Sequence, residues 1–225
     1  KGRIPILAGG TGLYVRALLE NYQFHPATGS EELRKKFTDL AEVHGSNYLH
    51  NMLQTVCPER AAQLHPNDLR RIIRALEVFH LAGQSVTETA ASLPGRLYYD
   101  ALVIGLTMNR NKLYDQINKR VDHMLAAGLI DEVKHLVSQG LSLNNQSMQG
   151  IGYKEVLLYL NGEINSQTLA ERIKQATRNF AKRQLTWYRK MPYIHWVDCD
   201  TYPDYEERVA YIYSLVAGKF PCQVE

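Results

Sequence analysis

The feature that most constrains the fold lies at the start of the chain, where a short apolar run enters a glycine-rich turn. Residues 4–8 are apolar, Gly9-Gly10-Thr11-Gly12 follow at once, and residues 13–20 have helical spacing. This strand–turn–helix order is typical of a parallel α/β sheet. Backbone N–H groups at such a turn lie beside a helix N-terminus, which favours an anion, and Thr11 adds a hydroxyl. Glycines alone fit a plain tight turn equally well. No G-x-x-x-x-G-K-[ST] phosphate loop occurs anywhere in the chain.

The rest of the pattern divides into a helical stretch and a mixed stretch. Residues 23–65 show only helical periodicity, with Ser30 as an N-cap, Gly45 closing one helix and Pro58 stopping the next. Buried strands are expected over residues 101–107 and 194–198. Further helices are expected over residues 68–82, 110–127, 130–139, 153–160, 167–190 (with Ser166 as its N-cap) and 204–217. We therefore predict an α/β fold with a parallel sheet core over residues 1–22 and 66–225, and an all-helical insertion over residues 23–65.

Composition indicates the cellular compartment of the protein but does not indicate its activity. The net charge of +3 is a mild basic excess, so the placement of the basic residues matters more than their number. The three cysteines are far apart and form no C-x-x-C pair, which argues against a disulfide framework or a zinc finger and favours a reducing, cytoplasmic setting. No apolar run approaches the roughly 20 residues of a membrane span. The chain opens without Met and directly in a strand-like run, so we expect earlier strands upstream of Lys1.

Three arginines gather on one face of the expected helix 68–82. Arg70, Arg71 and Arg74 lie opposite its apolar residues, and three guanidinium groups on one face suit phosphate contacts. A solvated helix face explains the same pattern. Glu77, close to one turn beyond Arg74, could partly neutralise it.

Arg120 is the sharpest single signal. It falls on the same stripe of its helix as Leu113, Ile117, Val121 and Met124, which we expect to face the core. A buried guanidinium needs a partner, because burying a charge unpaired is very costly. The partner can be a structural carboxylate or a ligand phosphate, and the pattern leaves both open.

Two further segments could contact nucleic acid. The long helix 167–190 has an apolar stripe formed by Leu169, Ile173, Ala176, Phe180 and Trp187. It also carries seven basic residues and ends with Trp187 and Tyr188, so it could follow a nucleic-acid backbone, although an ordinary amphipathic helix fits as well. The segment from Ser147 to Lys154 offers Gln149 for a base edge, glycines for close backbone approach and Tyr153 for stacking. Alone, it could equally be an ordinary loop.

Taken together, these strings resemble the bacterial tRNA dimethylallyltransferase (tRNA isopentenyltransferase) family. The match covers nearly the whole chain in order and spacing. Its strings are Gly9-Gly10-Thr11-Gly12-Leu13-Tyr14, His65-Pro66-Asn67-Asp68 with Arg70-Arg71-Ile72-Ile73-Arg74-Ala75-Leu76-Glu77, the Arg120 region, Gln149-Gly150-Ile151-Gly152-Tyr153-Lys154, and Ala176-Thr177-Arg178 through Lys182-Arg183-Gln184-Leu185-Thr186-Trp187.

The resemblance implies a fold, a reaction and partners. The core would be P-loop-NTPase-like. A dimethylallyl group would pass from dimethylallyl diphosphate to N6 of the adenosine just 3′ of the anticodon (adenosine 37), with Mg²⁺ assisting, diphosphate leaving and the base flipped out of the anticodon stem-loop. The family's phosphate loop, its Asp general base and most of the Mg²⁺ site would lie upstream of Lys1, so we expect this chain alone to be inactive. We also expect a cytoplasmic monomer with no membrane partner.

The resemblance also implies site residues. Thr11 would position the reacting base, and Gly10, Thr11 and Arg120 would hold the diphosphate. The tRNA contacts would come from Thr11 and from three further segments: Arg34 of the insertion; Arg70, Arg71, Ile72, Ile73 and Arg74; and Gln149, Gly150, Ile151, Gly152, Tyr153 and Lys154.

Two positions depart from the family pattern. Many relatives have Gln in place of Arg70 and Arg in place of Lys154, which puts base reading at the first position and a forked contact at the second in doubt.

Two other functions compete with this one. A nucleotide or small-molecule kinase with a helical lid would share the glycine turn and the clustered arginines. A non-catalytic RNA-binding fragment would share the basic faces.

Overall fold

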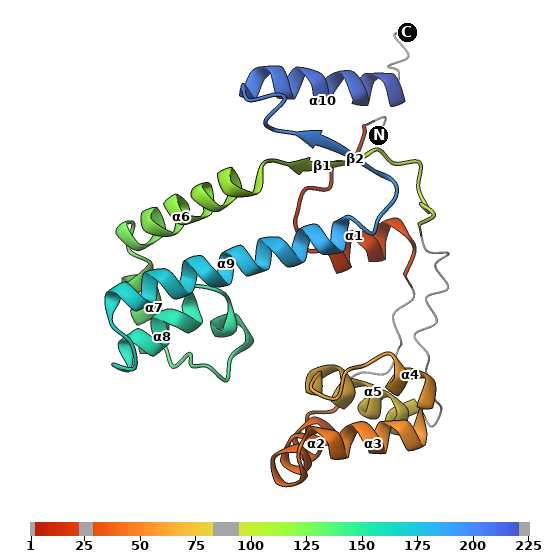
Figure 1. Ribbon diagram of the computed structural model, residues 1–225, viewed down its shortest axis with the longest axis vertical. Helices are drawn as coiled ribbons and strands as arrows, with labels where there is room; N and C mark the ends of the chain where they lie inside the picture. Colours follow the sequence, from red (N-terminus) through yellow and green to blue (C-terminus); the bar gives the residue numbers. More distant parts are fainter. Residues whose placement is uncertain (1–2, 23–28, 83–94, 221–225) are drawn as a thin grey trace. The chain divides into compact units, whose positions relative to one another are not determined.

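The computed structural model describes residues 3–22, 29–82 and 95–220. They belong to two compact units. One unit comprises residues 16–98, and the other joins residues 1–15 to residues 99–225. Helix α1 (Gly12–Leu19) crosses the point where the chain passes from one unit to the other (Figure 1).

The unit over residues 16–98 is helical in its described part. Beyond α1 its helices are α2 (Glu31–His44), α3 (Ser46–Val56), α4 (Pro58–Ala62) and α5 (Leu69–Ala82). Their ends follow the sequence signals. The Ser30 hydroxyl accepts from the Leu33 amide at 3.3 Å, and Gly45, with φ of 85°, separates α2 from α3.

The core of this unit joins α2 and α3 to α5. Phe37, Leu49, Leu53, Ile72 and Leu76 are all buried in one cluster. The sequence interpretation ended the insertion at residue 65, before α5. The compact unit in the structure includes α5, because Ile72 and Leu76 form part of the same core as the helices before them.

The second unit contains a parallel pair of strands and five α-helices among its described residues. The strands are β1 (Val103–Thr107) and β2 (Ile194–Asp198), paired with Gly105 opposite Trp196. The helices are α6 (Arg110–Ala126), α7 (Leu129–Ser138), α8 (Tyr153–Leu160), α9 (Ser166–Tyr188) and α10 (Tyr205–Lys219), with a short 3₁₀ helix at Gln146–Gln149. The sheet and α9 thus confirm the predicted parallel α/β pattern (Figure 1).

The core of this unit lies where α9 packs on α6 and α8. Val121, Val133, Val156, Leu169 and Ile173 are buried together. Polar contacts set the ends of the elements, as at α9, where the N-cap is Asn165 rather than the predicted Ser166. The Asn165 side chain accepts from the Thr168 amide at 2.8 Å.

The predicted strand over residues 4–8 is wrong. Its described residues adopt no regular structure and pair with neither β1 nor β2. Ile4, Ile6 and Leu7 are 49%, 90% and 60% exposed. A strand needs a hydrogen-bonded neighbour, so strand-like composition alone does not make one. Within residues 3–22, 29–82 and 95–220, no helix is both long and apolar enough to cross a bilayer.

Candidate functional site

The glycine turn packs against the C-terminal half of α9. The Gln184 side-chain amide donates to the Gly10 carbonyl at 2.8 Å, across 174 positions of sequence. The indole of Trp187 lies against Gly12. Between these two contacts, the Thr11 carbonyl accepts from the amides of Tyr14 and Val15 at 3.0 and 3.2 Å and so starts α1.

The glycines are needed here for close approach rather than for an unusual φ. Gly9, Gly10 and Gly12 are not among the glycines with positive φ. A Cβ on Gly10 would lie 2.6 Å from Gln184 Nε2, and a Cβ on Gly12 would lie 2.2 Å from Trp187 Cδ1. Both distances are far below van der Waals contact. The sequence showed a glycine turn but carried no signal for its partner on α9.

Arg120 does not face the core, which corrects the stripe assigned from the sequence. Its side chain is exposed, whereas Ile117 and Val121 are buried. The buried side of α6 faces α9. Across this contact, Arg178 of α9 donates to Asn118 of α6 at 2.7 Å, and Lys174 of α9 pairs with Asp122 of α6 at 2.7 Å. Arg120 lies beyond the edge of that contact. It forms no ion pair or hydrogen bond with another described residue, so its guanidinium can meet an anion from solution.

The arginines of α5 differ in what surrounds them. Arg70 and Arg71 are exposed, and Arg71 pairs with Asp68 at 3.2 Å. Arg74 pairs with Glu77 at 2.6 Å, the partial neutralisation expected from their spacing. Ile72 is 0% exposed, so its side chain belongs to the core and not to an RNA-contacting surface. The neighbouring Ile73 is half-buried.

Glu77 joins α5 to the start of α2. Its carboxylate is 0% exposed and accepts from the Ser30 amide at 2.7 Å, Arg74 Nη1 at 2.6 Å and Arg34 Nε at 2.9 Å. Burial alone raises the pKa of Glu77, but the hydrogen bonds from Arg74, the Ser30 amide and Arg34 together outweigh burial and hold the pKa below 4.5. Gly29 allows this arrangement, since a Cβ there would lie 2.1 Å from Arg34 Nη2.

The segment from Gln149 to Lys154 is held in place by its own contacts. The Gln149 side chain donates to the Leu143 carbonyl at 3.2 Å, and the Gly152 amide donates to Glu155 at 2.8 Å. Gly152 has φ of 99°, a conformation that favours glycine. Tyr153 is partly buried and its hydroxyl donates to Glu132, so its ring is not displayed for stacking as the sequence suggested. Gln149, Gly150, Ile151 and Lys154 remain exposed.

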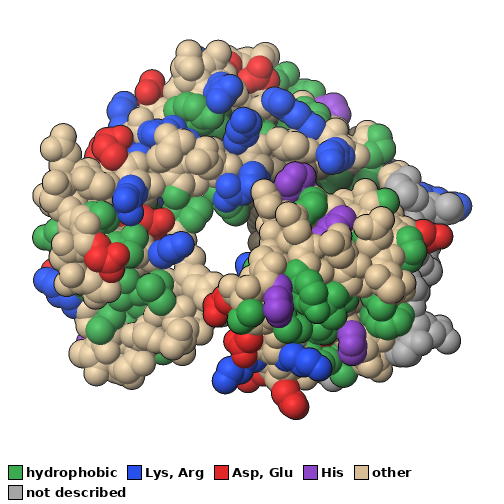
Figure 2. Space-filling view, turned by 60° about the horizontal axis from the view of Figure 1, so that its bottom comes forward, with side chains coloured by type: hydrophobic (Ala, Val, Ile, Leu, Met, Phe, Trp, Pro, Cys, Tyr) green, Lys and Arg blue, Asp and Glu red, His purple; other side chains and the backbone are tan. Residues whose placement is uncertain are grey.

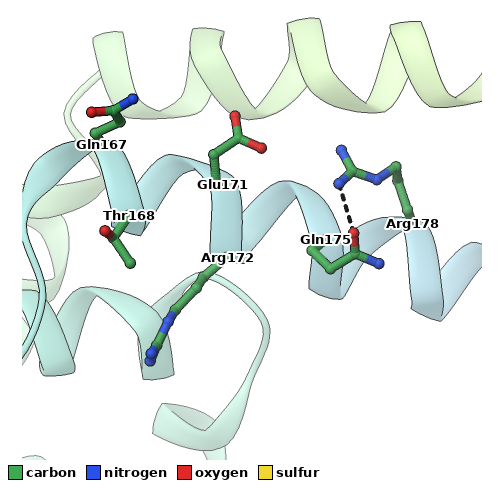
Figure 3. Close-up of a pocket in the computed structure, with 6 residues that line it drawn as sticks. All are labelled: Gln167, Thr168, Glu171, Arg172, Gln175 and Arg178. Carbon is green, nitrogen blue, oxygen red and sulfur yellow. Dashed lines mark hydrogen bonds between the residues drawn. The ribbon is translucent and has the colours of Figure 1, made fainter.

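Helix α9 offers two kinds of surface along its length. Its N-terminal half borders a shallow hollow (Figure 3). The lining residues are Gln167, Thr168, Glu171, Arg172, Gln175 and Arg178. In its C-terminal half, Phe180 and Trp187 are 42% and 38% exposed, and Arg183 lies over the Phe180 ring at 5.9 Å. The predicted apolar stripe is therefore buried only at Leu169 and Ile173.

Charge is mixed on the face of the molecule that Figure 2 draws. Figure 2 shows Lys and Arg side chains interspersed with acidic, histidine and hydrophobic ones. Among the residues that the structure describes, no group of three or more His, Cys, Asp and Glu side chains could hold a metal ion.

These features define an α/β protein with an exposed threonine at the start of a helix and basic side chains suited to phosphate. Residues 1–191 match the family of IPP transferases. The chain belongs to this family.

Relatives and solved structures agree with that assignment. The chain is 46% identical to the tRNA dimethylallyltransferase of Symbiobacterium thermophilum over 99% of its length and 70% of the relative's. It is 43% identical to the tRNA dimethylallyltransferase of Caldanaerobacter subterraneus, over 97% of this chain and 70% of the relative. The solved full-length tRNA isopentenylpyrophosphate transferase of Bacillus halodurans matches with a TM-score of 0.63 and 39% identity, over 97% of this chain and 67% of that one. The solved structure of a eukaryotic dimethylallyltransferase acting on tRNA matches with a TM-score of 0.70 and 28% identity, over 100% of this chain and 59% of that one. Among the competing interpretations, these matches favour a prenyltransferase over a kinase.

Proposed function

We propose that this chain provides part of the catalytic site that transfers a dimethylallyl group from dimethylallyl diphosphate to N6 of the adenosine just 3′ of a tRNA anticodon. The observation that carries the proposal is identity of 43–46% to named tRNA dimethylallyltransferases over at least 97% of the chain. In this reaction the N6 amine attacks the allylic carbon, the carbon–oxygen bond to diphosphate breaks, and N6 loses a proton. A general base, which we do not assign to any described residue, would take this proton.

Thr11 and Arg120 are the proposed catalytic residues of this chain. The exposed Thr11 hydroxyl would hydrogen bond the target base beside the reacting amine. Negative charge grows on the diphosphate as it leaves, and an arginine aimed at that charge lowers the barrier. Arg120 is suited to this role because its guanidinium is exposed and has no carboxylate partner among the described residues. Gly10 would add backbone contact to the same diphosphate.

The proposed tRNA contacts fall on both units, and each unit contributes its own set. Arg70 and Arg71 of α5 are exposed, and Arg34 and Arg74 keep 51% and 42% of their side chains in solvent while pairing with Glu77. Such guanidinium groups suit backbone phosphates. In the other unit, Gln149 and Lys154 are exposed at the ends of a pre-ordered segment and would contact the anticodon loop.

We infer a cytoplasmic monomer whose partners are the tRNA anticodon stem-loop and dimethylallyl diphosphate. Mg²⁺ would assist from ligands outside the described residues.

The experiment supplies the full-length protein with labelled dimethylallyl diphosphate and tRNA that lacks the modification. We expect label in the tRNA, and none when the adenosine beside the anticodon is replaced by guanosine. Transfer of phosphate from ATP to a small acceptor, without label in tRNA, would overturn the proposal in favour of a kinase. RNA binding without any transfer would overturn it in favour of a non-catalytic RNA-binding protein.

A further inference from the structure

We propose that Gln184 and Trp187 of α9 are positioning residues for the transfer reaction, because they hold the two glycines that flank Thr11. This inference rests on the proposed function, since it concerns the same site. It assigns to the C-terminal half of α9 a role in placing the catalytic hydroxyl, in addition to any contact that its basic residues make with RNA.

Thr11 lies in an open environment. Its side chain is exposed, and its hydroxyl makes no hydrogen bond with any described residue. The residue before it lies in a stretch without regular structure, and the residue after it opens α1. The placement of the hydroxyl therefore depends on the backbone at Gly10 and Gly12 and not on contacts of the side chain.

Helix α9 contacts this backbone on both sides of Thr11. Gln184 donates to the Gly10 carbonyl at 2.8 Å, and this is the side-chain hydrogen bond that ties the turn to α9. The Trp187 indole occupies the space where a side chain on Gly12 would be, within 2.2 Å of its Cβ position. Gln184 and Trp187 are three residues apart and so lie on one face of α9. One helix face thus holds both neighbours of Thr11.

Helix α9 is itself anchored in the core of its unit. Its N-terminal half is in the core through Leu169 and Ile173, which are each 1% exposed, and Arg178 bonds Asn118 of α6 at 2.7 Å. Arg178 precedes Gln184 by six residues, about 9 Å along the axis. A rigid helix that is fixed at one end and contacts the turn at the other can hold the hydroxyl in place. A displacement of about 1 Å at a reacting group can lower turnover about 10²-fold.

The test replaces Gln184 by Met in the full-length protein. Methionine has a similar length and no charge but cannot donate to the Gly10 carbonyl. We expect kcat to fall about 10- to 100-fold with tRNA affinity unchanged, and the midpoint of thermal unfolding to stay near that of the wild type. Gln167→Met is the matched control, the same exchange on the same helix away from the turn, and should leave kcat unchanged. Trp187→Leu should lower kcat in the same way.

A double-mutant cycle then separates positioning from a general structural role. If Gln184 acts through Thr11, the Thr11→Ala, Gln184→Met double variant should lose no more turnover than Thr11→Ala alone. The inference is overturned if Gln184→Met retains wild-type kcat, if its loss is only in thermal stability, or if the two losses multiply. Wild-type protein that transfers no prenyl group at all would instead reject the proposed function.

Discussion

The helical unit offers a sharp test of how a buried carboxylate stabilises this fold. The Glu77 carboxylate accepts hydrogen bonds from the Ser30 amide and from the guanidinium groups of Arg34 and Arg74. Ser30 and Arg34 precede Glu77 by 47 and 43 positions, so the carboxylate joins distant parts of the chain. Exchange for Gln keeps the size of the side chain but removes its charge and replaces one acceptor by an N–H₂ donor that faces an arginine. We therefore expect Glu77→Gln to destabilise residues 16–98 more than any exchange on their surface.

The magnitude follows from the contacts. Hydrogen bonds to charged groups contribute about 1.5–3 kcal/mol each, and Gln would retain part of them. Arg34 and Arg74 are 51% and 42% exposed, so water can solvate their guanidinium groups once the carboxylate is gone, which lowers the loss. We expect a loss of about 2–3 kcal/mol in the free energy of unfolding. For a cooperative unit of this size, that lowers the midpoint by about 10–20 °C.

The pH dependence has a defined sign. The pKa of Glu77 in the folded protein lies below its ordinary 4.5, so its ionisation stabilises the fold above pH 4.5, and that stability is lost as the pH falls from 4.5 through the folded pKa. The difference between wild type and Glu77→Gln should therefore shrink below pH 4.5.

Chemical and thermal unfolding, followed by circular dichroism at several pH values, measures both effects. The exposed Glu42 of α2 supplies the control, because Glu42→Gln should change the midpoint little at any pH. Equal midpoints for Glu77→Gln and wild type at neutral pH would refute the reasoning. A difference that persists unchanged well below pH 4.5 would refute the assignment of the stabilisation to the ionised carboxylate.

Four further outcomes are expected. Gly29→Ala should destabilise the helical unit by about 1–2 kcal/mol, since its Cβ would displace a guanidinium 2.1 Å away, and thermal unfolding measures this. Tyr153→Phe should cost about 1 kcal/mol by the loss of a hydroxyl–carboxylate bond, seen as a lower denaturant midpoint. Arg120→Ala in the full-length protein should lower the transfer rate about 10²–10³-fold, whereas Lys119→Ala should leave it unchanged; equal rates for Arg120→Ala and wild type would remove Arg120 from the site. Arg70→Ala should weaken tRNA binding and lower its salt dependence by about one phosphate contact, so an unchanged slope of affinity against salt would exclude that contact.

Local signals in the sequence predicted most elements of the fold. The N-cap at Ser30, the break at Gly45, the strand over residues 194–198 and the helix over residues 153–160 all lie where the pattern placed them. These features depend on residues within a few positions of one another, through capping, glycine conformation and hydrophobic period. The motif strings carried the family in the same way, because their order and spacing are properties of the chain alone.

The tertiary structure decided which faces are buried and which distant groups meet. Arg120 fits an apolar stripe by spacing, but α9 packs on another side of α6, so Arg120 is left exposed. Residues 4–8 have the composition of a strand but find no pairing partner among the described strands. The contact between Gln184 and Gly10 spans 174 positions, so no local pattern contains it. The sequence by itself determined the elements and the residues able to bind anions, since these follow from neighbours along the chain. Only packing between distant segments decided how Thr11 is held and where each arginine points.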